Sequence, residues 1–176
     1  MITAALLLAG SGAPLAAQEA TAADHYFRAV SEFFEIPAGE VAILRQWRLE
    51  AEEVPVVLFV AGRTGVSAEA LAQLRRSGQG WGDLVSRYGL DASHFHVPLP
   101  EAADAHALSG PYGQYRTLPP ARWREVRLTD ADIVVLVNVR LLAQTLRLPT
   151  EQVLRRHAGT PSFVELYAAL LPAGTR

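Results

Sequence analysis

The sequence predicts an all-α protein in which repeated helix-turn-helix hairpins pack around one core, with a long Pro-rich loop between the copies. Apolar residues recur at helical spacing along most of the chain. One part of the chain also repeats the apolar pattern of another without a gap. Hydrophobic residues make up 50% of the chain and charged residues 19%, which is typical of a folded globular protein.

The N-terminal residues 1–23 are expected to form either a signal peptide or a disordered tail. An apolar run at residues 2–9 is followed by Gly10, Gly12 and Pro14, as in a secretory signal, although no positive charge precedes it. The run is too short to cross a bilayer, which takes about 20 apolar residues. We therefore expect a periplasmic or secreted protein without a transmembrane anchor after signal removal.

Residues 24–171 are expected to form a single helical domain. It comprises three hairpin units, at about residues 24–49, 55–90 and 129–171. In the first unit, apolar side chains gather on one face of a helix at residues 23–35, which predicts Phe27 and Phe34 as core residues. A second helix follows at residues 40–48, after a break that contains proline and glycine.

The second unit opens with an apolar segment at Pro55 that suits either a strand or a buried helix. We favour a helix because the segment continues to Gly65, a residue type that commonly ends helices. Ser67 is the expected N-cap of the next helix. A short third helix then places Trp81 and Leu84 in the core.

The third unit begins at Thr129, which can cap a helix whose first turn is acidic. Two shorter helices are expected after it, at residues 151–157 and at about 162–171. The last helix carries Phe163 and Leu166 on its apolar face, and both are predicted core residues.

The second and third units share one pattern. A shift that places Phe59 on Leu141 also places Glu69 on Glu151. The same shift superposes Trp81, Leu84, Val85 and Tyr88 on Phe163, Leu166, Tyr167 and Leu170. Residues 36–41 resemble a third, degenerate copy. Such a unit cannot bury its apolar face alone, so we expect the copies to pair with one another.

The insert at residues 91–128 contains several prolines and is expected to be mostly loop. It supplies the candidate partner-binding residues Gly110, Pro111, Tyr112, Gly113, Tyr115 and Arg116. Backbone freedom, two rings and a guanidinium group suit contact with a peptide or glycan. The alternative is that the tyrosines pack onto the core.

Five segments carry a resemblance to a known family, at residues 66–69, 74–84, 88–90, 110–113 and 128–138. They resemble a family of exported bacterial proteins with helical-hairpin repeats whose function is uncharacterised. The resemblance covers most of the chain after about residue 25. It implies an exported helical protein and supplies no activity, cofactor or catalytic residue.

Residues 74–96 also resemble a DNA-binding helix-turn-helix. The recognition element would begin near Asp91, but it offers no Arg or Lys to contact phosphates. The net charge is −2 and the chain has no lysine, so we expect no general attraction to nucleic acid.

His94 and His96 flank Phe95, so in an extended segment both imidazoles would project to one side and could share a metal ion. No third ligand stands at a recognisable spacing, and surface histidines near a turn are the alternative. The absence of cysteine excludes disulfides and thiolate metal sites. We expect no resident cofactor.

No catalytic motif stands out in the sequence. The leading hypothesis is therefore a non-enzymatic exported structural or interaction protein of the cell envelope, which binds an envelope protein or a glycan. A DNA-binding helix-turn-helix protein is the alternative, and an enzyme of unrecognised type is the third possibility.

Overall fold

A computed structural model describes residues 15–160 and 162–171 of the chain, and within these residues all regular secondary structure is helical. The all-α fold class is therefore confirmed. The elements in chain order are α1 (Leu15–Phe34), α2 (Ala38–Leu44), η1 (Arg45–Trp47), η2 (Ala51–Glu53), α3 (Val54–Thr64), α4 (Ala68–Arg76), α5 (Trp81–Arg87), α6 (Ala92–Phe95), η3 (His106–Leu108), α7 (Ser109–Thr117), η4 (Pro120–Glu125), α8 (Asp130–Thr145), α9 (Thr150–His157) and α10 (Phe163–Leu170).

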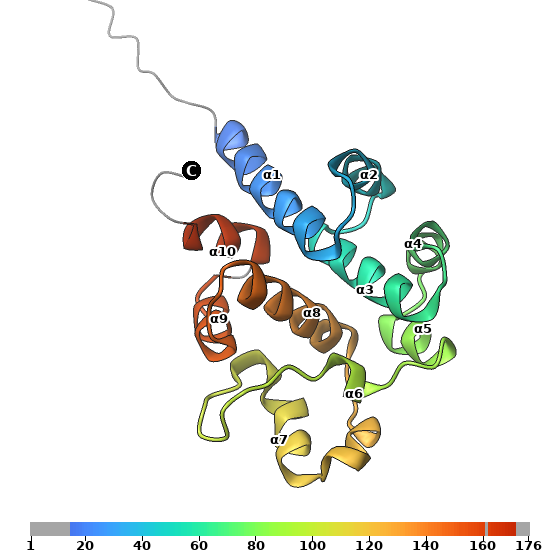
Figure 1. Ribbon diagram of the computed structural model, residues 1–176, viewed down its shortest axis with the longest axis vertical. Helices are drawn as coiled ribbons and strands as arrows, with labels where there is room; N and C mark the ends of the chain where they lie inside the picture. Colours follow the sequence, from blue (N-terminus) through green and yellow to red (C-terminus); the bar gives the residue numbers. More distant parts are fainter. Residues whose placement is uncertain (1–14, 161, 172–176) are drawn as a thin grey trace, which may run out of the picture.

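Helix α8 is central to the packing. It contacts α1, α3, α5, α6 and α9, while α10 packs along α1 (Figure 1). Its buried side chains are Ile133, Leu136, Val137, Asn138, Val139, Leu141 and Leu142. A helix that is apolar on several sides must be covered by neighbours on each of them. The segment that contains α6, α7 and η4 lies at the end of the molecule remote from α1 and α2 (Figure 1).

Local signals explain where several helices begin and end. The Ser67 hydroxyl accepts a hydrogen bond from the backbone N–H of Ala70, and Thr129 forms a reciprocal capping box with Asp132. Gly65 adopts a left-handed conformation with φ of 72° at the end of α3. The segment that begins at Pro55 is therefore helical, as expected from the glycine that follows it.

Five of the six predicted core side chains are buried, and these are Phe27, Trp81, Leu84, Phe163 and Leu166. Phe34 is only partly buried, and its ring packs edge-on against Phe33 with centroids 4.7 Å apart. It lies in the last turn of α1, where fewer neighbouring elements are available to cover it.

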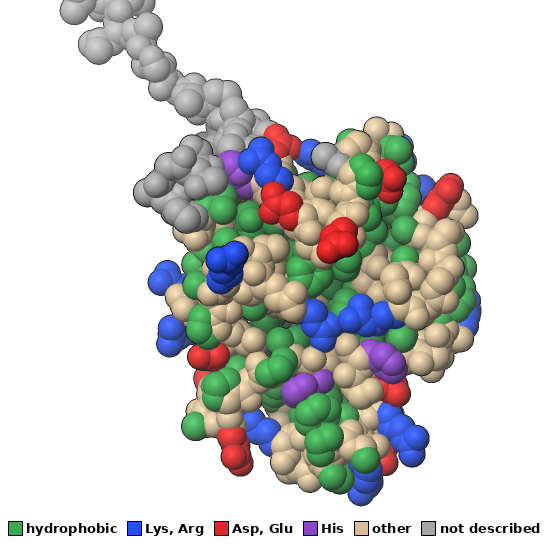
Figure 2. Space-filling model, in the orientation of Figure 1, with side chains coloured by type: hydrophobic (Ala, Val, Ile, Leu, Met, Phe, Trp, Pro, Cys, Tyr) green, Lys and Arg blue, Asp and Glu red, His purple; other side chains and the backbone are tan. Residues whose placement is uncertain are grey.

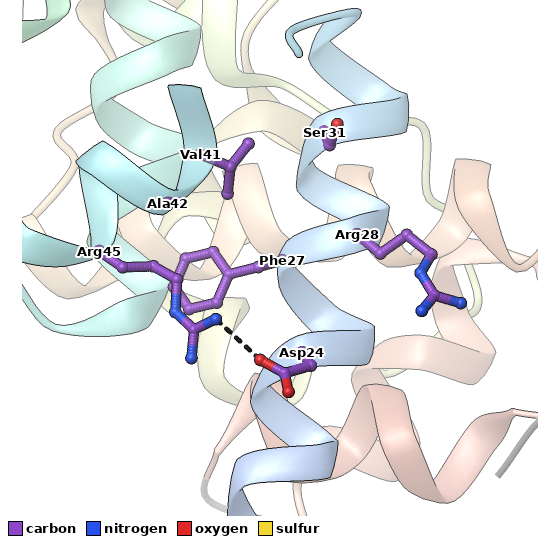
Figure 3. A pocket seen from close by; sticks show the side chains of 7 residues that line it. All are labelled: Asp24, Phe27, Arg28, Ser31, Val41, Ala42 and Arg45. Atoms are coloured by element: carbon purple, nitrogen blue, oxygen red, sulfur yellow. Dashed lines mark hydrogen bonds and ion pairs between the residues drawn. The ribbon is translucent and has the colours of Figure 1, made fainter. Parts of the chain in front are cut away.

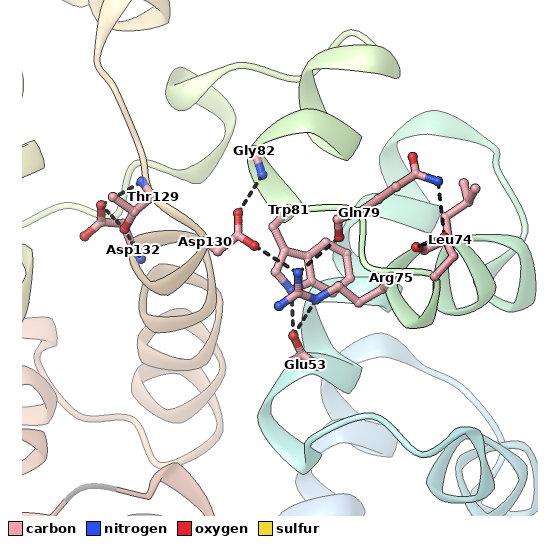
Figure 4. Close-up of polar contacts among 10 residues, drawn as sticks. Glu53, Leu74, Arg75, Gln79, Trp81, Gly82, Thr129, Asp130 and Asp132 are labelled. Atoms are coloured by element: carbon pink, nitrogen blue, oxygen red, sulfur yellow. Dashed lines mark hydrogen bonds and ion pairs between the residues drawn. The ribbon is translucent and has the colours of Figure 1, made fainter.

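A polar network joins η2 to helices α4, α5 and α8 (Figure 4). The Arg75 guanidinium donates to Glu53 at 2.7 Å and to Asp130 at 2.9 Å. The Trp81 indole also donates to Glu53 at 3.1 Å, and Asp130 accepts a hydrogen bond from the Gly82 backbone N–H. These bonds fix the start of α5 and the end of α4 against the start of α8.

A second polar group lies inside the core. Among the described residues, Asn138 is the polar residue classed as buried. Its amide oxygen accepts a hydrogen bond from the Tyr26 hydroxyl, and its amide nitrogen donates to the carbonyl oxygens of Glu52 and Val134, each at 2.9 Å. One side chain therefore connects α1, η2 and α8 with its hydrogen bonds satisfied.

The expectation that residues 91–128 form mostly loop is wrong for much of that segment, which contains α6, η3, α7 and η4. Pro111 lies in the first turn of α7, where a residue needs no intrahelical N–H bond, so the proline is tolerated. Pro111 is therefore compatible with helix α7, although prolines in this segment favour a loop when the sequence is considered alone. The candidate binding residues lie on this helix.

Helix α1 begins at Leu15, earlier than the predicted start at residue 23. Residues 15–23 are rich in alanine and contain no glycine or proline, which favours helix. The apolar run at residues 2–9, on which the signal-peptide prediction depends, lies outside the described residues.

Candidate binding site

Aromatic side chains from three segments meet at one end of the molecule. Helix α7 contributes Tyr112 and Tyr115, whose ring centroids are 5.4 Å apart. His96, which follows α6, lies 4.8 Å from the Tyr115 ring and 4.0 Å from the Trp123 ring of η4. Rings at these distances make favourable contacts, so the cluster fixes α6, α7 and η4 relative to one another.

The polar atoms of these rings are occupied by backbone carbonyl groups. The Tyr112 hydroxyl donates to Val97, and the Tyr115 hydroxyl donates to Ala92 at 2.7 Å. The Trp123 indole N–H donates to Tyr115 at 3.0 Å and to a second carbonyl in the same turn. Both tyrosines are buried, so the partly buried Trp123 is the ring of these three that offers carbon surface to an approaching molecule.

A cavity of about 510 Å³ opens beside this cluster. Its lining residues are His96, Pro98, Leu99, Pro100, Glu101, Tyr112, Tyr115, Arg116 and Trp123. Cavities of this size are common among ligand sites, which are mostly apolar with a few polar groups. The structure thus provides an aromatic pocket, by which we mean this cavity and its lining.

Arg116 holds the rim of the aromatic pocket in place. Its guanidinium donates to the carbonyl oxygens of Pro100 and Ala103, at 3.1 and 2.6 Å. These bonds fasten the extended segment after α6 to helix α7. Arg116 is otherwise exposed, and Glu101 on the same rim is also exposed, so the edge of the pocket carries both signs of charge.

His96 differs from the other rings of the pocket. Within the part of the chain that the structure describes, its ring nitrogens form no hydrogen bond. Burial and the nearby charge of Arg140 lower the pKa of the His96 imidazole, which is therefore neutral at pH 7. A neutral imidazole offers one donor and one acceptor. His96 can therefore form a hydrogen bond to a ligand, whereas the polar atoms of the surrounding rings are already engaged.

The six sequence-predicted binding residues do not all reach the pocket. Tyr112, Tyr115 and Arg116 line it, but both tyrosines are buried, with 2% and 3% of their surface exposed, as the alternative of tyrosines packed onto the core expected. Pro111 is buried, and Gly110 and Gly113 lie exposed, where a side chain in place of the glycine would point into open space.

No pattern along the chain predicts the other half of the pocket. His96 is expected only as a possible metal ligand, and neither Trp123 nor Leu99 stands in a pattern that predicts a binding site. The available signal was the extended Pro98 to Pro100 segment, since prolines favour exposed extended backbone with an apolar surface.

The metal hypothesis assumed that residues 94–96 are extended, and this geometry is wrong. His94 lies in the helical turn α6, where its ring bonds to Asp91 as part of the helix cap. His96 instead packs on Trp123. Within the described part of the chain, no group of three or more His, Asp or Glu side chains is placed to hold a metal ion.

The helix-turn-helix hypothesis places its recognition element at α6, which has only four residues. Ala92 and Phe95 of this turn are buried, and Ser93 and His94 bond to Asp91. Figure 2 shows acidic and basic side chains scattered over the face drawn there, without a continuous basic surface.

A second, smaller cavity of about 200 Å³ lies between α1 and α2. Arg45 reaches across the Phe27 ring and pairs with Asp24 at 2.7 Å (Figure 3). This ion pair is exposed and contributes at most about 1 kcal/mol to stability. The cavity is a shallow gap between two helices and offers fewer aromatic surfaces than the aromatic pocket.

Comparison with known protein families, with curated proteins and with solved structures finds no match to this chain. The resemblance to a family of exported helical-repeat proteins therefore stays a prediction. Over the residues that the structure describes, no helix is both long enough and apolar enough to pass through a membrane.

Proposed function

We propose that this chain is a non-enzymatic interaction protein of the cell envelope, and that its aromatic pocket binds an apolar segment of a partner protein. The observation that carries the proposal is the open cavity beside the buried Tyr112 and Tyr115, whose hydroxyls bond to backbone carbonyls. The partly buried Leu99 and Trp123 present apolar surface to it. Binding of apolar groups to such a surface is favourable because it removes apolar area on both molecules from water.

A protein partner fits the pocket better than a glycan. Sugar hydroxyls need many hydrogen-bonding groups, and the hydroxyl and indole groups here are already engaged. A peptide needs few hydrogen-bonding groups in the pocket, because its side chains fill the cavity and its backbone requires only an occasional hydrogen bond. His96 and the charged rim residues Glu101 and Arg116 supply those partners.

We further propose that the scaffold beneath the pocket is a set of repeated hairpins. The shift seen in the sequence relates α3, α4 and α5 to the second half of α8, α9 and α10, with closely matching helix bounds. Trp81 and Phe163 occupy equivalent first positions of α5 and α10, and both are buried. This agreement of bounds and burial supports a common unit.

The corners of the units supply independent support. Glu35, Gly65 and Arg147 each follow the first helix of a unit, and each adopts a left-handed conformation, with φ of 54°, 72° and 54°. In each case the residue two positions later is the N-cap of the next helix, with φ near −60° and ψ near 140°. Left-handed conformations are uncommon outside glycine, so their coincidence favours repetition.

Two neighbouring glutamates connect the units. Glu53 accepts the Trp81 indole N–H at the start of α5. Glu52 accepts the Ser162 hydroxyl at 2.9 Å and the Phe163 backbone N–H at 2.6 Å at the start of α10. One short helix, η2, thus bonds to the equivalent helix of both later units, which supports a scaffold organised around a shared centre.

The pocket is tested by NMR titration of ¹⁵N-labelled protein with a short capped peptide of proline and leucine, and separately with a trimer of N-acetylglucosamine. The chain has three tryptophans. The indole signal of Trp123 should shift saturably with the peptide, because this ring lines the pocket. The signals of Trp47 and Trp81 are internal controls and should stay in place.

A matched pair of variants completes this test. Leu99→Arg places a charge on the pocket wall and should weaken peptide binding at least about tenfold, which corresponds to about 1.4 kcal/mol. Ile43→Arg makes the same kind of change at an exposed leucine-sized side chain of α2 and should have no effect. A response to the sugar and none to the peptide would contradict the proposal.

Location in the envelope is tested by fractionation of cells that express the full chain with a C-terminal tag. The proposal expects the tag in the periplasmic or secreted fraction, with a shortened N-terminus on mass spectrometry. Recovery of the intact chain only in the cytoplasm would contradict the envelope part of the proposal and would leave the pocket to be judged by the titration.

A further inference from the structure

Two arginines from different helices lie against one phenylalanine ring. The guanidinium carbon of Arg63, near the end of α3, lies 3.5 Å from the centroid of the Phe59 ring. The guanidinium carbon of Arg140, in the middle of α8, lies 4.7 Å from the same centroid. Both cations gain from the ring, and the charge of Arg63 also acts on Arg140, whose pKa it helps to lower.

Neither arginine has an acidic partner. Within residues 15–160 and 162–171, the structure contains no ion pair that involves Arg63 or Arg140. The chain as a whole does not lack acidic residues, because it has 18 of them and 16 arginines. Two guanidinium groups that contact one ring, neither of them in an ion pair with a carboxylate, are a local excess of positive charge.

Arg140 also has an unused donor. One terminal nitrogen donates to the carbonyl oxygens of His94 and His96, at 3.2 and 2.8 Å. The other terminal nitrogen, Nη1, is buried and has no hydrogen-bond partner. A buried donor without a partner costs about 1–3 kcal/mol, and more when it is charged. An unsatisfied group of this kind calls for a water molecule or an ion beside it.

We infer that Arg63 and Arg140 form a binding site for a doubly charged tetrahedral oxyanion, such as phosphate or sulfate, either free or at the end of a larger ligand. A dianion balances both guanidinium charges, whereas a carboxylate balances one. Its oxygens accept hydrogen bonds in the paired geometry that guanidinium groups present. Figure 2 shows basic side chains side by side near the middle of the face drawn there.

The protonation of the pair agrees with this site. Burial and the neighbouring Arg63 lower the pKa of Arg140 to about 10. Burial also lowers the pKa of Arg63. Both groups nevertheless remain charged at pH 7, so the positive charge is present for an anion to meet. A bound dianion would raise both pKa values again.

The site is tested by NMR of protein labelled with ¹⁵N at arginine only. The chain has 16 arginines, whose side-chain signals are titrated with sodium phosphate at constant ionic strength. Two signals, assigned through variants to Arg63 and Arg140, should shift saturably. Glycerol phosphate in a second arm separates a terminal phosphate from the free ion. Uniform, non-saturating shifts of all arginines would overturn the inference.

Variants distinguish the pair from general surface charge. Arg63→Gln removes an exposed side chain, so the fold should survive, and it should weaken phosphate binding measured at the Arg140 signal at least about tenfold, about 1.4 kcal/mol. Arg87→Gln, an exposed arginine at the end of α5, is the matched control and should bind as the parent does. Acetate that binds as tightly as phosphate would also overturn the inference.

Discussion

At the scale of single residues, Trp81 and Phe163 begin helices α5 and α10 and are among the most deeply buried side chains of the described chain. Each ring contacts a basic side chain of the helix that precedes its own in the chain. The Arg75 guanidinium carbon lies 5.4 Å from the Trp81 ring, and the His157 ring stacks on Phe163 with centroids 4.0 Å apart. The two rings therefore fill equivalent places with different neighbours.

Removal of either ring should leave a large cavity. We predict that Trp81→Ala and Phe163→Ala each lower the free energy of unfolding by about 3–5 kcal/mol, as is usual for buried aromatic side chains. Equilibrium denaturation in urea measures this loss. Trp47→Ala is the control, because Trp47 is only partly buried and its loss should cost less. Losses below about 1 kcal/mol for the two buried rings would contradict their placement.

His157 should make stability depend on pH. Burial lowers the pKa of its imidazole below the ordinary value of 6.5, although Glu52 acts in the opposite direction. As the pH falls through 6.5, the unfolded chain therefore binds a proton before the folded protein does, and the free energy of unfolding decreases. His96 contributes in the same direction. Stability should thus decline from pH 6.5 toward the lower pKa of the folded state.

His157→Phe tests this assignment because it keeps a ring against Phe163 but removes the titrating group. Urea denaturation at several pH values below 7 should show a smaller decline than in the parent protein. His96→Phe should remove a further part of the decline. If both variants lose stability with falling pH as steeply as the parent, other groups are responsible.

At the scale of elements, the helix corners give the clearest support to the proposed repeat. Arg147 adopts φ of 54° at a corner where the second unit has Gly65, which lies at φ of 72°. A non-glycine residue in this conformation destabilises the folded state by about 1–2 kcal/mol. Glycine avoids this strain, but it loses more conformational entropy on folding, which offsets part of the gain.

We therefore predict that Arg147→Gly raises the free energy of unfolding by about 0.5–1 kcal/mol. The reverse change, Gly65→Ala, should lower it by about 1 kcal/mol, although a Cβ atom at Gly65 would meet no other atom within 4 Å. Thermal and urea denaturation measure both changes. Destabilisation by Arg147→Gly would show that the arginine side chain stabilises this corner more than the backbone strains it.

Most helices could be predicted because their signals are local. Ser67, Thr129 and Gly65 mark helix ends through bonds and conformations that involve only a few neighbouring residues. Helix α7 was missed because Pro111 and its flanking glycines favour a turn when considered alone. The packing of Tyr112 and Tyr115 against the rest of the insert overrides that local preference.

At the scale of the whole molecule, the binding site could be predicted only in part. Tyr112, Tyr115 and Arg116 stood out because rings and a cation cluster within a few residues. His96 and Trp123 join them only after α6, α7 and η4 have packed together, and no spacing along the chain signals that contact. Sites assembled from distant segments need the tertiary structure to be seen.

The hairpin units and the aromatic pocket have separate roles in this account. The proposed units bury the apolar helices, and Glu52 and Glu53 of η2 and Asn138 of α8 form hydrogen bonds that connect η2 to α5, α8 and α10. The pocket lies in the insert between the second and third units, at the end of the molecule remote from α1 (Figure 1). Changes to the pocket rim should therefore leave the scaffold intact.

The most direct test places a photoreactive benzophenone side chain at the position of Leu99, on the pocket wall, and irradiates intact cells. The same group at the position of Ile43, an exposed side chain of α2, is the control. The account predicts a discrete crosslinked product from position 99, in the envelope fraction, that is absent from position 43. Equal products from both positions, or none from position 99, would contradict it.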